Sequence, residues 1–110
     1  MRRFFTVRYK CKSEYAAQNE VLVRDLMAEL TQTRTEGVRY AVFKLEDGVS
    51  FIHLVVTETE AMLEPLGRLD AYRALQHRKM DRFDERPVVT ELHELGAYGL
   101  FPEALAPQKP

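Results

Sequence analysis

Residues 37–57 read GVRYAVFKLEDGVSFIHLVVT, and this stretch decides the fold. Two runs rich in Val, Ile, Phe and Tyr flank a single Asp47-Gly48 pair. Asp-Gly readily adopts the positive φ that a two-residue hairpin turn requires, so the pattern predicts an antiparallel β-hairpin. One polar residue, His53, lies in the middle of the second run.

The segment before the hairpin predicts a strand followed by a long helix. From Phe4 to Cys11, bulky and polar residues alternate, which places one set of side chains on a single face: Phe5, Val7, Tyr9 and Cys11. From Glu14 to about Thr33, leucines recur at every fourth residue and form an apolar stripe: Leu22, Leu26 and Leu30. Ser13, directly before this helix, is expected to cap its first turn.

The segment after the hairpin predicts a shorter helix and a last strand. The helix is expected from about Leu69 to Met80. A charged loop then covers residues 81–86, and Pro87 can open a fourth strand over residues 88–98, because its missing N–H does least harm there. We therefore expect one domain over residues 1–100 and a Pro-containing tail over residues 101–110.

The expected order of elements is strand, helix, strand, strand, helix, strand. This is the split βαβ arrangement of the α+β ferredoxin-like fold, βαββαβ, in which both helices cover one face of a four-stranded antiparallel sheet. The other face is apolar too, because the third strand turns several bulky residues away from the helices: Ile52, Leu54 and Val56. Each bulky side chain left in water forgoes roughly 1.5–3 kcal/mol. We therefore expect a homodimer that pairs sheet to sheet.

Composition and charge exclude several classes of function. The chain has 16 Lys plus Arg and 17 Asp plus Glu, and its formal charge of −1 provides no basic field for nucleic acid. No apolar run reaches the length of a membrane span and no signal peptide is recognisable, so we expect a soluble cytoplasmic protein. The single cysteine, Cys11, excludes an internal disulfide and is expected to be a small buried side chain.

The hairpin carries a family resemblance. Residues 37–43 and 51–55, with the order of elements above, resemble the dimeric α/β-barrel superfamily, and within it the small proteins grouped with the antibiotic biosynthesis monooxygenase domain. The similarity covers roughly residues 3–100. It implies a barrel of two paired sheets and a pocket between helices and sheet in each subunit. It also implies oxidation of a polycyclic phenol without a cofactor, or binding and degradation of haem.

His53 is the strongest candidate for a catalytic residue. It shares a strand face with Phe51 and Val55, so it is expected to be buried and neutral, and a neutral imidazole in an apolar pocket is a competent base near pH 7. The alternative is a structural histidine held by hydrogen-bond partners. Tyr9, Tyr40 and Tyr72 could supply hydroxyls or aromatic walls to a substrate pocket, and core packing would explain them equally well.

Two further residues are expected near a ligand. Phe51 would contribute to the wall of the pocket. His77 lies on the second expected helix, and the resemblance would make it an iron ligand by position, with an exposed helix-end residue as the alternative. Glu91 and His93 are two ligand types on one strand, too few to close a metal site, so neither a metal nor a cofactor is expected.

Two hypotheses follow for the function. The first is a monooxygenase-like enzyme that acts on a small aromatic or apolar molecule, with His53 as the base and Tyr72 in the pocket wall. The second is a non-catalytic dimeric module that binds a small ligand or serves as an accessory domain. An enclosed cavity beside His53 or His77 is required by the first hypothesis.

Overall fold

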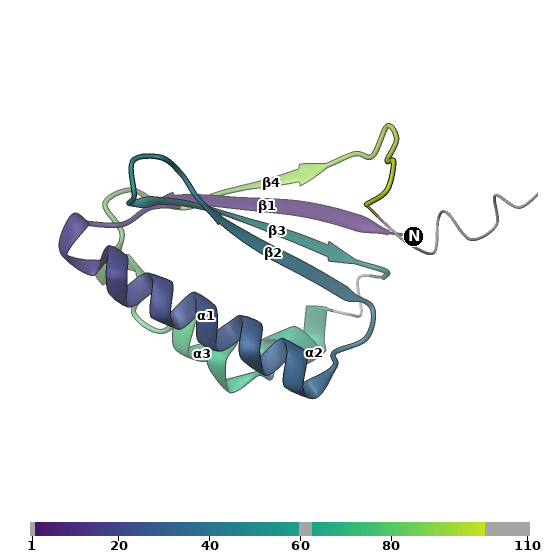
Figure 1. Cartoon of the computed structure of the whole chain (residues 1–110), viewed down its shortest axis with the longest axis horizontal. Helices are drawn as coiled ribbons and strands as arrows, with labels where there is room; N and C mark the ends of the chain where they lie inside the picture. The colour runs from purple at the N-terminus through teal and green to yellow at the C-terminus, as the bar shows by residue number, and fades with distance from the viewer. Residues whose placement is uncertain (1, 60–62, 101–110) are drawn as a thin grey trace, which may run out of the picture.

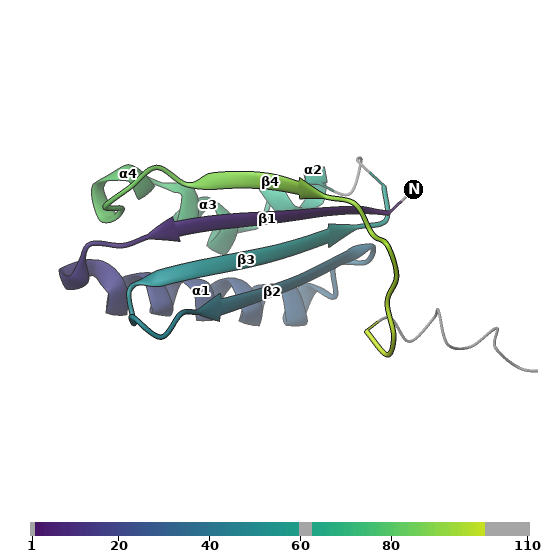
Figure 2. The same cartoon turned by 90° about the horizontal axis from the view of Figure 1, so that it is seen from above.

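The computed structural model describes residues 2–59 and 63–100 as two layers, a sheet and a set of helices on one of its faces (Figure 1). The sheet has four antiparallel strands in the order β2-β3-β1-β4 (Figure 2). Their bounds are β1 Arg3–Lys10, β2 Val38–Lys44, β3 Ser50–Thr57 and β4 Val88–Leu92. This is the α+β ferredoxin-like arrangement that the sequence predicts.

The two central strands direct one set of side chains into the core between the layers. In the β1–β3 pairing Tyr9 lies opposite Phe51, and Val7 lies opposite His53. Tyr9, Phe51 and His53 are 5%, 1% and 3% exposed. The alternation predicted for β1 and β3 is therefore confirmed, and His53 is buried as expected.

The loop of the β2–β3 hairpin is longer than predicted. The Leu45 N–H donates to the Ser50 carbonyl, which leaves four residues in the loop instead of two. Gly48 takes a positive φ of 77°, while Asp47 does not take a positive φ. The Asp47 carboxylate accepts bonds from the backbone N–H groups of Val49 and Ser50, at 3.0 and 2.8 Å, so it stabilises the wider turn.

The long helix α1, Ala16–Thr33, is entered through a short 3₁₀ turn, η1 Ser13–Tyr15. Ser13 makes no side-chain cap bond, so that prediction is wrong; the turn closes through the Tyr15 N–H and the Lys12 carbonyl. The helix buries four side chains, of which only Leu26 belongs to the expected leucine stripe: Ala16, Asn19, Val23 and Leu26. Leu22 and Leu30 pack at the border of the core.

The second helical region consists of three short helices and not the single one predicted. These are α2 Leu63–Gly67, α3 Asp70–Gln76 and α4 Lys79–Arg82. The break between α3 and α4 comes from Arg78, which has a left-handed φ of 50°. Glu29 of α1 accepts a 2.7 Å bond from the Ala71 N–H, so α1 caps the first turn of α3.

Residues 81–86 differ from the charged loop that was expected. Phe83 is buried, and Cys11 forms an isolated antiparallel bridge with it. Arg82 is also buried and donates to the backbone carbonyls of Leu75 and His77. The last strand ends at Leu92 instead of continuing to residue 98. The expected tail, 101–110, lies outside the described residues.

Neither described part of the chain contains a helix that is long and apolar enough to cross a membrane.

Candidate functional site

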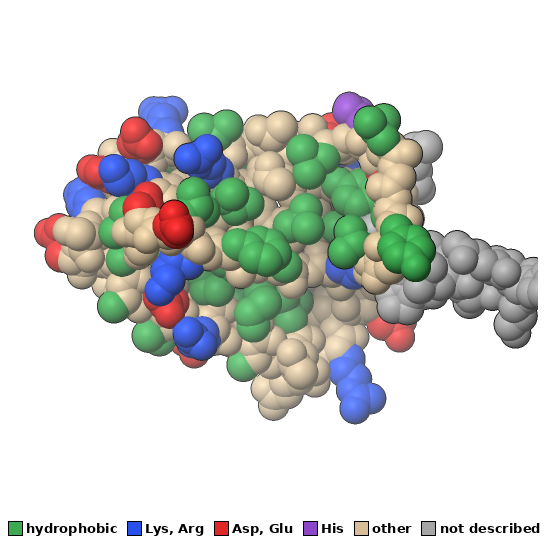
Figure 3. Space-filling view, turned by 45° about the horizontal axis from the view of Figure 1, so that its top comes forward, with side chains coloured by type: hydrophobic (Ala, Val, Ile, Leu, Met, Phe, Trp, Pro, Cys, Tyr) green, Lys and Arg blue, Asp and Glu red, His purple; other side chains and the backbone are tan. Residues whose placement is uncertain are grey.

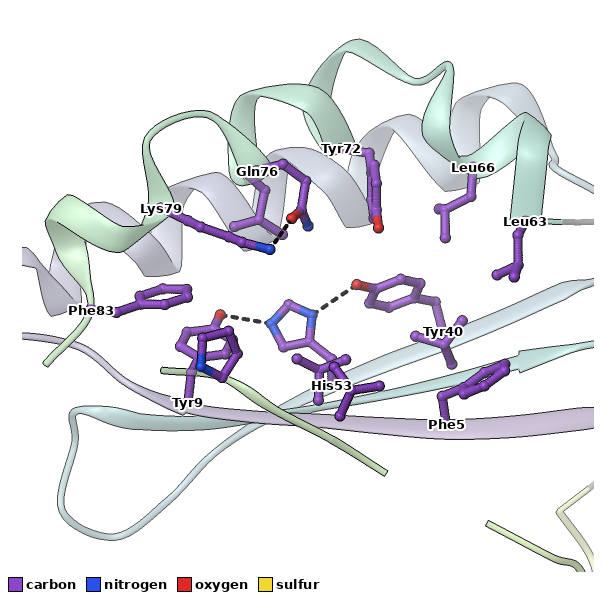
Figure 4. Close-up of a pocket in the computed structure, with 15 residues that line it drawn as sticks. Phe5, Tyr9, Tyr40, His53, Leu63, Leu66, Tyr72, Gln76, Lys79 and Phe83 are labelled. Atoms are coloured by element: carbon purple, nitrogen blue, oxygen red, sulfur yellow. Dashed lines mark hydrogen bonds between the residues drawn. The ribbon is translucent and has the colours of Figure 1, made fainter. Parts of the chain in front are cut away.

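A cavity of about 330 Å³ lies between the helices and the sheet (Figure 4). The three longer strands supply its floor through Phe5, Val7, Tyr9, Tyr40 and His53. The short helices supply the opposite wall through Leu63, Leu66, Tyr72, Gln76 and Lys79. The volume is at the low end of the range for small-molecule sites, and most of the lining is apolar.

His53 stands between two tyrosine hydroxyls on the floor of this cavity. Its Nε2 lies 2.7 Å from Tyr9 Oη, and its Nδ1 lies 2.8 Å from Tyr40 Oη. Tyr9 Oη also accepts a 2.8 Å bond from Asn19 Nδ2 of α1. A continuous chain of hydrogen-bonded side chains therefore runs from α1 to the cavity through Asn19, Tyr9, His53 and Tyr40. Figure 4 shows its last two bonds, on either side of His53.

This chain has a preferred direction. A neutral imidazole has one N–H and one bare nitrogen, so one tyrosine donates to it and the other accepts. Since Tyr9 Oη accepts from Asn19, its own proton is free to go to Nε2. The Nδ1–H then donates to Tyr40 Oη, whose proton is left to point into the cavity. This arrangement satisfies the more deeply buried hydroxyl, that of Tyr9.

Burial keeps all of these groups uncharged. Desolvation lowers the pKa of His53 from its ordinary 6.5 to about 4. It raises the pKa of Tyr9 to about 12, although the bond from Asn19 acts in the opposite direction. Desolvation also raises the pKa of Tyr40 and Tyr72. At neutral pH the floor of the cavity therefore consists of a neutral histidine and protonated tyrosines.

The aromatic rings hold this geometry in place. Tyr9 stacks on Phe83 with centroids 4.3 Å apart and on Phe51 at 5.6 Å. The Tyr40 ring meets the His53 ring edge-on at 5.6 Å. Such pairs add roughly 0.5–1.5 kcal/mol beyond the area they bury. Each hydrogen-bonding ring of the chain is thus fixed by at least one neighbouring ring.

The structure brings together most, but not all, of the residues that the sequence singled out. His53, Tyr9, Tyr40 and Tyr72 all line the cavity. Phe51 is buried behind Tyr9 and does not reach it. His77 follows the end of α3, is exposed, and lies outside the lining.

Three residues of the site were missed by sequence reasoning. Asn19 reads as part of a solvated helix face, although its spacing from Ala16 and Val23 matches the buried face of α1. Phe83 is the one aromatic residue within a charged stretch, and that was its only signal. Lys79 lies three residues after Gln76 and seven after Tyr72, which is the spacing of the helix face that lines the cavity, but a charged side chain there is expected in solvent.

The residues present do not fit a haem site. His77, the ligand that the resemblance offers, is outside the cavity, and both nitrogens of His53 are bonded to tyrosines. In residues 2–59 and 63–100 no group of three or more His, Cys, Asp or Glu is placed to hold a metal ion. Glu91 instead forms a 2.8 Å ion pair with Arg3.

Cys11 is buried beside this site, as expected. It is a free thiol that is 1% exposed, and desolvation raises its pKa to about 11. The reactive thiolate is therefore scarce at neutral pH, and the residue acts as a small core side chain.

The same fold occurs in solved structures, several of which are described as proposed antibiotic biosynthesis monooxygenases. Rv0793 from Mycobacterium tuberculosis has this fold, with 18% identity, a TM-score of 0.70, and 88% of this chain and 98% of that chain covered. A proposed antibiotic biosynthesis monooxygenase from Bacteroides thetaiotaomicron superposes with a TM-score of 0.77 at 12% identity, with 91% of this chain and 94% of that chain covered.

A third solved structure is SnoaB, described as a cofactor-independent oxygenase from Streptomyces nogalater. It has 11% identity and a TM-score of 0.67, with 89% of this chain and 97% of that chain covered. No protein-family model and no curated protein matches the sequence. At these identities the similarity defines the fold, and in this respect the resemblance noted in the sequence is confirmed.

Proposed function

We propose that this chain is a monooxygenase-like protein that acts on, or binds, a small aromatic or apolar molecule in the pocket beneath the sheet, without a tightly bound cofactor. The observation that carries this proposal is the cavity of about 330 Å³ beside His53. An apolar wall with a few converging polar groups is the usual form of a small-molecule site. The fold shared with a cofactor-independent oxygenase agrees with it.

Oxygenation without a cofactor requires the substrate as an anion, so a proton must leave it in a dry site. We assign this proton transfer to His53, acting through Tyr40, which also lines the cavity and whose Oη lies 2.8 Å from His53 Nδ1. The substrate hydroxyl would pass its proton to Tyr40 Oη while the Tyr40 proton moves to Nδ1. This transfer requires His53 to exchange the tautomer derived above for the other one, in which Nε2–H donates to Tyr9 Oη and Nδ1 accepts from Tyr40.

The other candidate function is a non-catalytic ligand-binding module. It is favoured by the pKa of about 4 at His53, which makes this residue a weak base at neutral pH, and by the bonds at both ring nitrogens. In that case Tyr40 only donates its hydroxyl proton to an acceptor on the ligand. The two functions share the pocket and differ in whether a proton is removed.

Dioxygen uptake distinguishes the two functions. Chelator-treated protein is incubated with a panel of polycyclic phenols, and oxygen consumption is recorded for wild type, His53→Gln, Tyr40→Phe and the control Tyr98→Phe, whose ring is 93% exposed. If the protein is an oxygenase, wild type and control should consume oxygen, and the rate of consumption should be at least about tenfold lower in the two pocket variants. Saturable ligand binding with no uptake by wild type would support the non-catalytic module instead.

We also propose that the protein is a homodimer joined through the helix-free face of the sheet. Hydrophobic side chains gather across the middle of this face, and charged ones toward one end (Figure 3). The strand register places four residues in one row across it: Phe43, Ile52, Arg8 and Val88. Phe43 and Val88 are 56% and 61% exposed in the single chain, so a second copy would remove them from water.

A further inference from the structure

The pocket carries an unbalanced positive charge. Among the described residues that line it, Lys79 alone has a formal charge at neutral pH, because His53 and the tyrosines are neutral. Lys79 is half-buried, and its Nζ donates a 2.6 Å bond to the neutral amide oxygen of Gln76. Within the described ranges no carboxylate lies within 4.0 Å of this ammonium group, whereas Lys44 is paired with Glu20 at 3.0 Å.

A second cation lies behind the same end of the pocket. Arg82 is 5% exposed, and its guanidinium donates to the Leu75 and His77 carbonyls without a carboxylate partner in the described part of the chain. It is close enough to Tyr9 to act against the rise in that pKa, and it lies 5.6 Å from the ring centroid of Phe83 in the pocket wall. Two positive charges in a poorly solvated region attract an anion more strongly than charges in water do.

The pocket is also divided along its length. Lys79, Gln76 and Tyr72 extend toward its middle from the helical side, opposite the tyrosine hydroxyls that flank His53 (Figure 4). Phe5, Leu63 and Leu66 form an apolar end (Figure 4). This distribution fits a molecule with an apolar body and one polar head.

From these observations, and resting on the pocket of the proposed function, we infer that the natural ligand is a small organic acid. Its carboxylate or equivalent anionic group lies against Lys79 and Gln76, and its aromatic or aliphatic body lies toward Phe5, Leu63 and Leu66. Lys79 is thus the specificity-determining residue, because no other described lining group carries a charge that distinguishes an anion from a neutral molecule of the same shape.

Two probes of nearly equal shape test this inference, 2-naphthoate and its neutral amide, 2-naphthamide. Both are titrated by calorimetry into the full chain, as wild type, Lys79→Met and the control Lys12→Met, which removes an exposed lysine outside the pocket. Because a charge-assisted hydrogen bond is roughly twice as strong as a neutral one, wild type and control should bind the acid at least about tenfold more tightly than the amide. In Lys79→Met the acid should lose this advantage.

The outcomes separate this inference from the proposed function. Equal affinities for both probes in wild type, or an acid preference that survives in Lys79→Met, overturn the acid assignment while the pocket itself stands. Binding of neither probe overturns both the assignment and the pocket. Selective acid binding together with no dioxygen uptake supports the assignment and contradicts the oxygenase.

Discussion

At the scale of single residues, the unusual feature is a buried, neutral histidine whose two ring nitrogens are each hydrogen-bonded to a tyrosine. Burial at 3% exposure would leave an unbonded imidazole at a cost of roughly 1–3 kcal/mol per unsatisfied nitrogen. Tyr9 and Tyr40 satisfy one ring nitrogen each. The same bonds hold the ring beside Tyr40, and the proposed proton transfer requires in addition that His53 take its other tautomer, in which Nδ1 is bare.

The first prediction concerns the pH dependence of stability. The pKa of His53 is about 4 in the folded chain and close to 6.5 when unfolded, so between these values only the unfolded state binds the proton. The free energy of unfolding should therefore fall as the pH is lowered from about 6.5 to about 4, by as much as about 3 kcal/mol. Urea denaturation at several pH values gives the slope of the unfolding free energy against pH. This slope should be smaller in His53→Gln than in wild type, by the equivalent of up to one proton. Identical slopes would contradict the lowered pKa of His53.

The second prediction concerns the tyrosine that links α1 to the histidine. Tyr9→Phe keeps the ring stacked on Phe83 but removes the hydroxyl that bonds Asn19 Nδ2 and His53 Nε2. Buried polar groups deprived of a partner cost about 1–3 kcal/mol, so urea denaturation should show a loss of that size. Tyr98→Phe, at a 93% exposed ring, should change stability by less than about 0.5 kcal/mol. Equal effects of both changes would mean that the chain of hydrogen bonds contributes nothing.

Sequence reasoning reached part of this site. The period of two in β1 and β3 predicts that Tyr9 and His53 face the core, but it cannot tell that their hydroxyl and imidazole meet. That contact depends on the strand register, in which Val7 and not Tyr9 lies directly opposite His53. Asn19 was not predicted as part of the site for another reason. A polar residue on a helix is expected to face water unless its buried hydrogen-bond partner is already known.

At the scale of elements, the hairpin strands and the helices were predicted where one periodicity dominates the sequence. The residues at which these elements end were not predicted correctly. Val38–Lys44 and Ser50–Thr57 follow the two apolar runs closely. The predicted two-residue turn between them was wrong, because the Asp47 side chain stabilises a four-residue loop. An Asp-Gly pair is compatible with both kinds of turn. The single helix expected over residues 69–80 failed because Arg78 takes a left-handed conformation, which sequence patterns rarely reveal.

The third prediction tests that loop. Gly48 has a φ of 77°, and a Cβ added there would meet nothing within 4 Å. Gly48→Ala should therefore lose about 1 kcal/mol of stability through backbone strain alone, measured by urea denaturation. Gly96→Ala is the matched control, because its added Cβ also meets nothing within 4 Å and its φ is not positive. If the two variants are equally stable, the positive φ of Gly48 carries no cost.

At the scale of the whole molecule, topology was the most predictable level. Six segments in the order strand, helix, strand, strand, helix, strand, joined by right-handed crossovers, allow few strand orders in the sheet. The observed order β2-β3-β1-β4 is the one that the ferredoxin-like fold requires. The helices account for one face of this sheet (Figure 1). The pocket could be predicted only from the family resemblance. A cavity forms where the side chains of the two layers leave a gap in the packing, and the periodicity of a sequence does not reveal such gaps.

The last prediction concerns the uncovered face. Phe43 lies in the row with Ile52 and Arg8, and its 56% exposure means that a charge there leaves the single chain's core intact. If two copies pair through this face, Phe43→Glu places an unpaired charge of each copy in an apolar contact. The chain should then sediment as a 12.8 kDa particle at micromolar concentration, while wild type sediments at twice that mass.

Val21→Glu supplies the control, because Val21 is 57% exposed on α1 and so matches Phe43 in exposure but lies in the helical layer. It should remain dimeric. A wild-type chain that sediments as a monomer contradicts the pairing directly, and a dimer that both variants preserve places the interface elsewhere. The pocket opens between helices and sheet, so monomeric Phe43→Glu should still bind 2-naphthoate, which would separate assembly from ligand binding.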